Sequence, residues 1–97
     1  MKEADLFAEQ AAWLRHQLPQ VQEDDLPLLT LVSLGWEGTT LAFAQQIDCP
    51  HALALRSAHH LAALDLIVAQ EDVGRSGRLA ITMGERLRLL LEGAEDS

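Results

Sequence analysis

Apolar residues recur at helical spacing along most of the chain, and the first two helices follow from that pattern. In the segment 2–18 the apolar positions fall on one stripe of a helix, which ends before Pro19 because the residue preceding a proline disfavours the α region. The run LPLLTLVSLG at 26–35 is too apolar for a surface helix. It predicts a central core helix that is capped by Asp24 or Asp25 and closed by a glycine.

Two further helices follow, separated by a short break. After the loop WEG, Thr39 or Thr40 caps a helix that ends at Ile47, with Ile47 on its inner side. The tripeptide DCP then interrupts the chain, and a second helix runs from Pro50 to Leu64. Two helices joined by so short a break predict a helix-turn-helix.

The period of the pattern changes after this helix pair. The segments LIVAQED (66–72) and RLAIT (78–82) are short, and a glycine-containing turn, VGRSG, joins them. They predict a β-hairpin whose turn region, the wing, spans 72–79. Thr82 then caps a final helix, which Gly93 ends.

This order of elements is that of a winged helix-turn-helix. We expect one domain over 1–97, mostly α with a small β-hairpin, made of an N-terminal helix at 1–19 and a winged-helix core at 26–92. In such a fold the second helix of the pair, 50–64, enters the major groove of DNA, and the hairpin reaches toward the flanking backbone.

Three motifs in this order resemble the DNA-binding core of MarR-type regulators, over about Leu26 to Leu91. TTLAFAQQIDCP resembles the first helix and turn of that family, LRSAHHLAALDLI its recognition helix, and GRSGRLAITMGERL its wing and the helix after it. In the last motif Gly84 lets that helix pack closely. The resemblance implies a transcriptional regulator that binds double-stranded DNA, with Arg56 at the position of the family's recognition-helix arginine.

The chain departs from the family's pattern at two positions. Asp65 stands where the family has a turn glycine, and the turn is expected to survive because Asp tolerates the left-handed conformation. Leu55 stands where the family has a DNA-facing threonine. The resemblance does not extend to the long C-terminal helices through which full-length members dimerise. The first helix carries Trp13 on an apolar face that is too wide for this small domain alone, so we expect a homodimer whose interface uses the first and last helices of this chain.

Candidate DNA contacts lie on the helix pair and on the wing. Thr39 and Thr40 cap a helix N-terminus that can meet a phosphate, and Arg56 can contact a guanine edge or a phosphate. His51 and His59 are eight residues apart, so they share a face and can donate to DNA. Arginines of the wing attract the flanking phosphates. The full predicted set is Thr39, Thr40, His51, Leu55, Arg56, His59, Arg75 and Arg78.

The charge of the chain limits how strongly this surface can attract DNA. Its 97 residues include 7 Lys and Arg against 15 Asp and Glu, which gives a net charge of −8 and a pI of about 4.7. The segment 73–92 holds four arginines against two glutamates and is net +2, whereas the rest of the chain holds three basic against thirteen acidic residues and is net −10. We expect binding through a few arginines, with a steep salt dependence.

The same acidity supports an alternative interpretation. Ala52 and Leu55 place apolar side chains on the helix that is expected to face DNA. A winged-helix module that binds a protein partner, and no DNA, is consistent with such a surface.

Composition and spacing exclude several other classes of protein. No apolar run approaches the roughly 18 residues of a membrane span. The N-terminus MKEADLF lacks the basic and apolar regions of a signal peptide, so we expect a cytoplasmic protein without membrane contact. The single Cys49 excludes a disulfide scaffold. The chain has neither a catalytic constellation nor a set of metal ligands, so we predict no enzyme, no metal and no cofactor.

Overall fold

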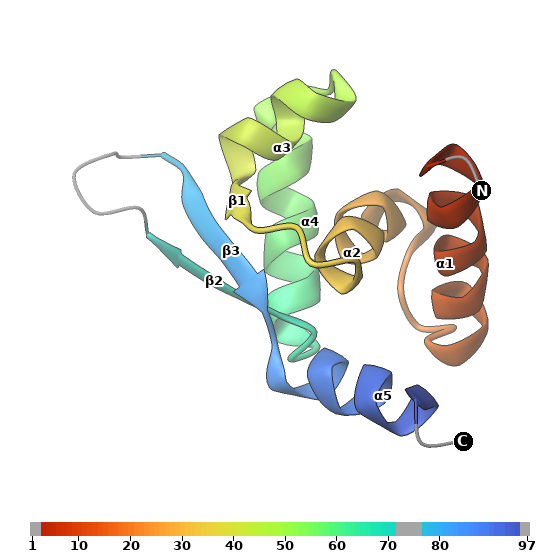
Figure 1. Ribbon diagram of the computed structural model, residues 1–97. Helices are drawn as coiled ribbons and strands as arrows, with labels where there is room; N and C mark the ends of the chain where they lie inside the picture. The colour runs from red at the N-terminus through yellow and green to blue at the C-terminus, as the bar shows by residue number, and fades with distance from the viewer. Residues whose placement is uncertain (1–2, 72–76, 96–97) are drawn as a thin grey trace.

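A computed structural model describes residues 3–71 and 77–95 of the chain. Within these residues it has five α-helices, a short 3₁₀ helix (η1) and three strands (Figure 1). The elements in chain order are α1 (Glu3–Gln17), η1 (Glu23–Asp25), α2 (Leu26–Ser33), β1 (Gly38–Thr39), α3 (Thr40–Ile47), α4 (His51–Ala63), β2 (Ile67–Glu71), β3 (Leu79–Met83) and α5 (Glu85–Glu95).

Helix α2 lies at the centre of the fold, as its apolar run predicts. It sits between α1 and α4 (Figure 1), and its buried side chains include Leu28 and Leu29, neither of which is exposed to solvent. Thr30 is also buried, and its hydroxyl donates to the carbonyl of Leu26 at 2.7 Å, so it places no unsatisfied polar group in the core. The helix closes before Gly35, which has a φ of 98°.

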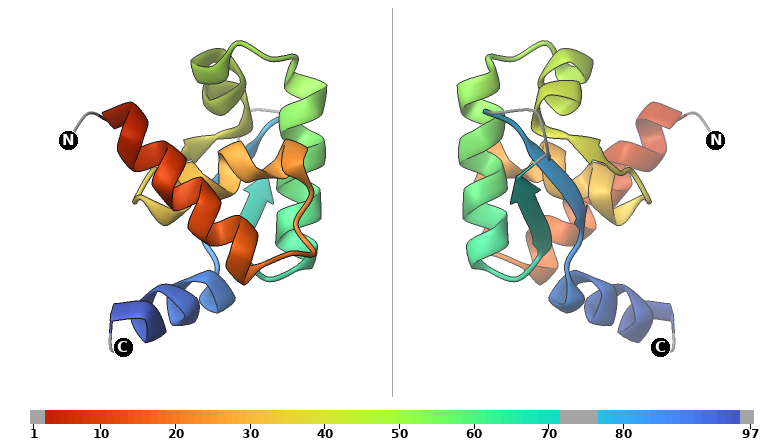
Figure 2. Two further views of the ribbon diagram at one scale, coloured as in Figure 1. Left: turned by 90° about the vertical axis from the view of Figure 1, so that its right-hand side faces the viewer. Right: turned by 90° about the vertical axis from the view of Figure 1, so that its left-hand side faces the viewer.

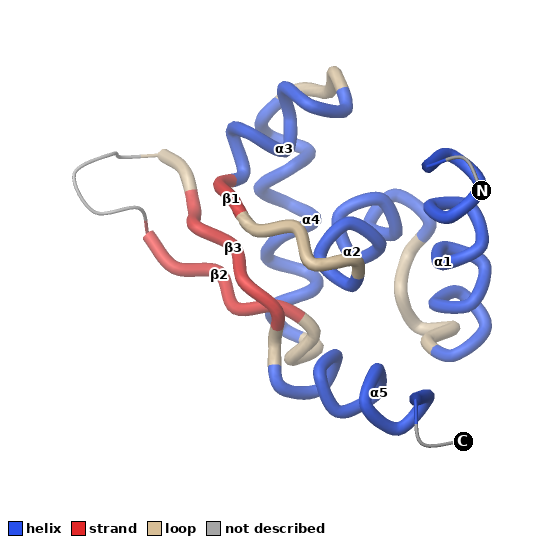
Figure 3. Tube along the Cα trace, in the orientation of Figure 1, coloured by secondary structure: helices blue, strands red, loops and turns tan. Residues whose placement is uncertain are grey.

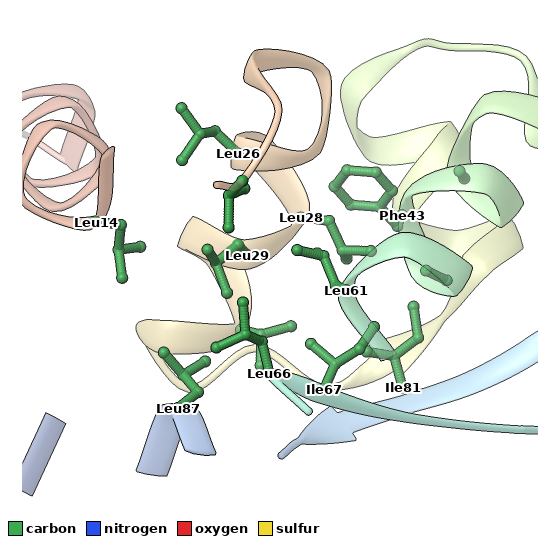
Figure 4. Packing of buried hydrophobic residues seen from close by; sticks show 14 of the residues in the cluster. Leu14, Leu26, Leu28, Leu29, Phe43, Leu61, Leu66, Ile67, Ile81 and Leu87 are labelled. Atoms are coloured by element: carbon green, nitrogen blue, oxygen red, sulfur yellow. The ribbon is translucent and has the colours of Figure 1, made fainter. Parts of the chain in front are cut away.

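One hydrophobic core joins the other elements to α2. Figure 4 shows Leu14 of α1, Leu61 of α4, Ile81 of β3 and Leu87 of α5 directed toward the same interior. Each of these side chains is at most 1% exposed. Burying one large aliphatic side chain contributes about 1.5 to 3 kcal/mol, so the terminal helices are held to the winged-helix core by the same driving force as its centre.

The sheet has one strand more than the sequence predicts. Its order is β1-β3-β2, with β3 antiparallel to both neighbours (Figure 3), and Gly38 is opposite Ile81 while Ala69 is opposite the same residue on the other side. The expectation of a two-stranded hairpin is therefore incomplete. β1 has only two residues and no alternating pattern, so only its pairing with β3 reveals it as a strand.

Three local expectations are wrong. Thr82 lies within β3 and pairs with Val68, so it does not cap α5. The amide of Gly84 still donates to the carbonyl of Leu66 at 3.0 Å, and α5 begins only after this bond. Gly93 does not end α5, which continues to Glu95. Ile47 is not on the inner side of α3, because Phe43 and Ala44 take that face and Ile47 is 39% exposed. The residues of these three wrong expectations are Thr82, Gly93 and Ile47.

Two aspartates close the helices of the helix-turn-helix. Asp65 follows α4 with a φ of 62°, as expected for a residue at the position of a turn glycine. Asp48 ends α3 with a φ of 56°, so the break between α3 and α4 also depends on a left-handed residue. Pro50 then occupies the N-cap position of α4 rather than its first turn.

Candidate nucleic-acid interface

The helix pair α3–α4 is built so that one side of α4 is buried and the other is exposed. Ala54, Ala58 and Leu61 face inward and are at most 1% exposed. The small alanine side chains allow α4 to lie close to its neighbours. The opposite side of α4 carries exposed residues, including Ala52, Leu53 and Arg56. This is the surface that a winged helix-turn-helix presents to a groove.

Thr39 caps α3 as the sequence predicts. Its side-chain oxygen accepts the amide hydrogen of Ala42 at 3.1 Å, while its own backbone is extended. The side chain is partly exposed. The N-terminus of α3 is thereby ordered by a residue that remains at the surface.

Thr40 has a different role from the one expected, because it is fully buried. Its hydroxyl shares a hydrogen bond of 2.8 Å with Nε2 of His51 and accepts the amide hydrogen of Leu79 at 3.0 Å. Its side chain is consequently not offered to a ligand at the surface. It links the first turn of α3 to the first residue of α4 and to the first residue of β3, at the base of the wing.

The remaining predicted contacts on α4 are all at least partly accessible. His51 is half-buried, and its ring orientation is set by the hydrogen bond to Thr40. Leu55 is half-buried and His59 is exposed, and their spacing of four residues places them on one face of the helix. The structure thus brings His51, Leu55 and His59 onto the outer part of α4.

Arg56 has a partner that its place in the chain does not predict. Its Nη2 lies 3.5 Å from Oδ2 of Asp24 in η1, and both side chains are well exposed, at 49% and 77%. The neighbouring Ser57 donates from its hydroxyl to the carbonyl of Asp24 at 3.4 Å. Figure 2 shows the segment before α2 running beside α4, which brings these residues together.

A buried carboxylate lies next to this contact. Asp25 is 2% exposed, and its Oδ2 is 2.9 Å from Nδ1 of His60 in α4. Asp25 occupies the N-cap position of α2, as expected, but its side chain makes no capping hydrogen bond. Its other oxygen, Oδ1, has no partner within the part of the chain that the structure describes. The burial of this carboxylate therefore depends on His60.

The basic segment 73–92 contributes fewer available arginines than its composition indicates. Arg86 and Arg88 lie on α5, where Arg86 donates to the carbonyl of Leu64 at 3.2 Å and Arg88 is paired with Glu85 and Glu92. The hydrogen bond and charge of Glu85, together with Glu92, raise the pKa of Arg88 above its ordinary value. Two of the four arginines are thus engaged on a helix rather than presented by the hairpin.

The other two arginines belong to the wing itself. Arg78 is half-buried just before β3 and has an interaction of its own. Arg75 falls in the segment 72–76, outside the described residues. Its contact with DNA remains a prediction.

A groove separates the two terminal helices on the side away from the hairpin. Gln10 and Trp13 of α1 line a cavity of about 400 Å³ together with Leu91 and Ala94 of α5. A second cavity of about 380 Å³ shares Trp13 and Ala94 and extends along α5 past Leu90. Trp13 is half-buried and lines both cavities.

Neither a metal site nor a membrane helix is found where the structure describes the chain. Over 3–71 and 77–95, no three His, Cys, Asp or Glu side chains gather in a way that could bind a metal ion. None of the helices there has the length and apolar character needed to cross a bilayer.

Solved structures of MarR regulators share this arrangement. A MarR transcriptional regulator from Methanosarcina mazei matches with a TM-score of 0.68 over 96% of this chain and 68% of its own length, at 10% identity. A transcriptional regulator from Thermotoga maritima gives 0.67 over 96% and 65%, at 5% identity. A MarR protein from Peptoclostridium difficile gives 0.66 over 96% and 60%, at 9% identity.

These matches establish the fold. Five helices and a three-stranded antiparallel sheet take the arrangement of the MarR winged helix-turn-helix, as the sequence motifs imply. The chain spans 60 to 68% of the length of the three regulators. No family model matches the sequence, and no curated protein is similar to it in sequence.

Proposed function

We propose that this protein is a DNA-binding transcriptional regulator that uses α4 as its recognition helix. The observation that carries the proposal is the match of 96% of the chain, helix pair and sheet included, to solved transcriptional regulators. In a winged helix-turn-helix the exposed side of the second helix enters the major groove, and the hairpin lies over the flanking backbone.

The residues on and around α4 have side chains suited to both tasks. The guanidinium of Arg56 has paired N–H donors that can bond to a guanine edge, and the partly exposed Leu55 can contact a thymine methyl group. His51 and His59 supply ring donors on the same helix, and Thr39 holds an accessible helix N-terminus for a phosphate. The buried Thr40 contributes indirectly, because its hydrogen bond orients the ring of His51. In the wing, Arg75 and Arg78 are assigned to the flanking phosphates.

We also propose that the protein works as a homodimer through the groove between α1 and α5. Trp13 lines both cavities of that groove, and Leu89 of α5 is 54% exposed. A large aromatic side chain that is partly exposed beside apolar residues is characteristic of an interface. A two-fold dimer would read two half-sites about one helical turn apart.

The test is DNA binding by variants that remove one arginine from different surfaces. Arg56→Gln and Arg78→Gln are compared with Arg88→Gln, which removes the same charge from α5. Fluorescence anisotropy with genomic DNA fragments at low salt should show weaker binding for the first two variants and a smaller change for the third. Equal losses in all three would mean that only net charge matters. No binding by the wild-type protein would contradict the proposed function.

A second function is favoured by one specific observation. At the α3–α4 corner, Leu53 is 42% exposed and Ile47 is 39% exposed, and Ala52 beside them is exposed as well. This apolar corner fits the alternative of an acidic winged-helix module that binds a protein partner without DNA. Ile47→Ser distinguishes the two, because Ile47 lies at the end of α3 and outside the proposed recognition helix. The substitution should abolish capture of a stoichiometric partner if this corner binds a protein, and it should leave DNA affinity close to that of the wild-type protein.

A further inference from the structure

Three consecutive acidic residues form η1, and each contacts a different basic side chain. Glu23 accepts two hydrogen bonds from Arg15 of α1, at 2.8 and 3.1 Å. Asp24 faces Arg56, and Asp25 is bonded to His60, both on α4. The turn therefore connects the first helix of the chain to its recognition helix by charge.

The position of Asp24 is fixed by its neighbours on both sides. On one side, the hydrogen bond and charge of Glu23 raise the pKa of Arg15 above its ordinary value, as expected for a cation held by a two-point contact. On the other, the buried Asp25 is anchored to His60. The carbonyl of Asp24 itself accepts from Ser57. The backbone that carries this carboxylate is thus held against α4, rather than free to move away from it.

We propose that Asp24 is a built-in competitor of DNA for Arg56. Its carboxylate presents an anionic oxygen to the guanidinium, as a phosphate of the DNA backbone or an acceptor on a guanine edge would do. Contact of Arg56 with DNA then competes with its contact to Asp24. This inference rests on the proposed function, since it concerns which partner the recognition-helix arginine takes.

The exposed geometry makes this competition reversible. Because both side chains are about half exposed or more and 3.5 Å apart, the pair is weak, and a polyanion can break it. Asp24 also places a negative charge beside the DNA path, which repels phosphate. Both effects lower affinity in the wild-type protein, and both disappear when the carboxylate is neutralised.

The experiment compares two variants that remove one negative charge each. Asp24→Asn neutralises the competitor, and Glu9→Gln neutralises an exposed glutamate on α1. DNA affinity is measured by fluorescence anisotropy on the full chain at two salt concentrations. An exposed ion pair is worth up to about 1 kcal/mol, so Asp24→Asn should bind DNA about two- to five-fold more tightly than Glu9→Gln. The difference should shrink when Arg56→Gln is added to both, because only the direct repulsion of phosphate by Asp24 then remains.

The possible outcomes separate this inference from the function on which it rests. DNA binding by all proteins, with equal affinities for Asp24→Asn and Glu9→Gln, overturns the competition and leaves the regulator function intact. A difference that survives Arg56→Gln undiminished also overturns it, because Asp24 would then act through its charge alone. Binding by Asp24→Asn but not by the control supports it. Absence of DNA binding in every protein contradicts the proposed function, and the inference with it.

Discussion

Gly84, between β3 and α5, lies against the backbone of the turn after α4, and replacing it tests the packing of the fold. A Cβ at this position would lie 2.6 Å from the carbonyl oxygen of Asp65, 2.7 Å from the carbonyl carbon of Leu66 and 2.8 Å from the nitrogen of Ile67. These distances are 0.6 to 0.8 Å below the 3.4 Å of ordinary contact. All three atoms belong to the backbone, so no side chain can rotate away.

The expected cost of Gly84→Ala follows from this crowding. Overpacking a close contact costs about 1 to 3 kcal/mol, and the upper end applies here because the β3–α5 junction must move away from the α4–β2 turn. For a domain of this size each kcal/mol lowers the midpoint of thermal unfolding by about 4 to 8 °C. We therefore expect Gly84→Ala to unfold at least about 10 °C below the wild-type protein.

Gly93→Ala is the matched control, with the opposite sign. Gly93 lies within α5, and a Cβ there would meet no atom within 4 Å. Alanine is more favourable than glycine in a helix by about 0.5 to 1 kcal/mol, so this variant should unfold at a higher temperature than the wild-type protein. Calorimetry or circular dichroism of both variants decides the matter. Unchanged or raised stability in Gly84→Ala would show that the junction is not packed as described.

Three further substitutions test the core, the helix cap and the groove. Leu61→Ala removes a fully buried side chain and should destabilise the protein by about 2 to 5 kcal/mol in urea unfolding, whereas a loss below 1 kcal/mol would place it outside the core. Thr39→Ala removes the cap of α3 and should cost about 0.5 to 2 kcal/mol, with Thr39→Ser restoring most of the stability. Trp13→Glu places a charge in the groove between α1 and α5 and should convert a dimer to a monomer in light scattering, and an unchanged mass would exclude the groove as the dimer interface.

The parts of the fold that the sequence predicts are those determined by local pattern. The apolar run of α2 permits no surface location, and the positive φ of Asp65 follows from its place at the end of α4. The sequence predicts close packing at Gly84, and the structure shows the backbone atoms that require it. In each of these places one short segment contains the information.

The parts that it does not predict depend on residues distant in sequence. β1 exists because Gly38 and Thr39 pair with β3, and its two residues carry no pattern of their own. Thr40 looks like a surface cap, but its hydroxyl is satisfied by partners 11 and 39 residues away. In the sequence, Arg56 is an available cation. In the structure, η1 lies beside α4, and Asp24, 32 residues away in the chain, contacts Arg56. Such contacts require the tertiary arrangement, which local spacing does not specify.

The central claim, that α4 and the wing read DNA, is tested most directly by selecting bound sequences from a random pool of double-stranded DNA. The chain is used at low salt, because its net charge of −8 weakens attraction to phosphate as a whole. The account predicts enrichment of a two-fold symmetric sequence whose half-sites lie about one helical turn apart. Recovery of DNA without any enriched sequence, or of no DNA at all, would contradict it.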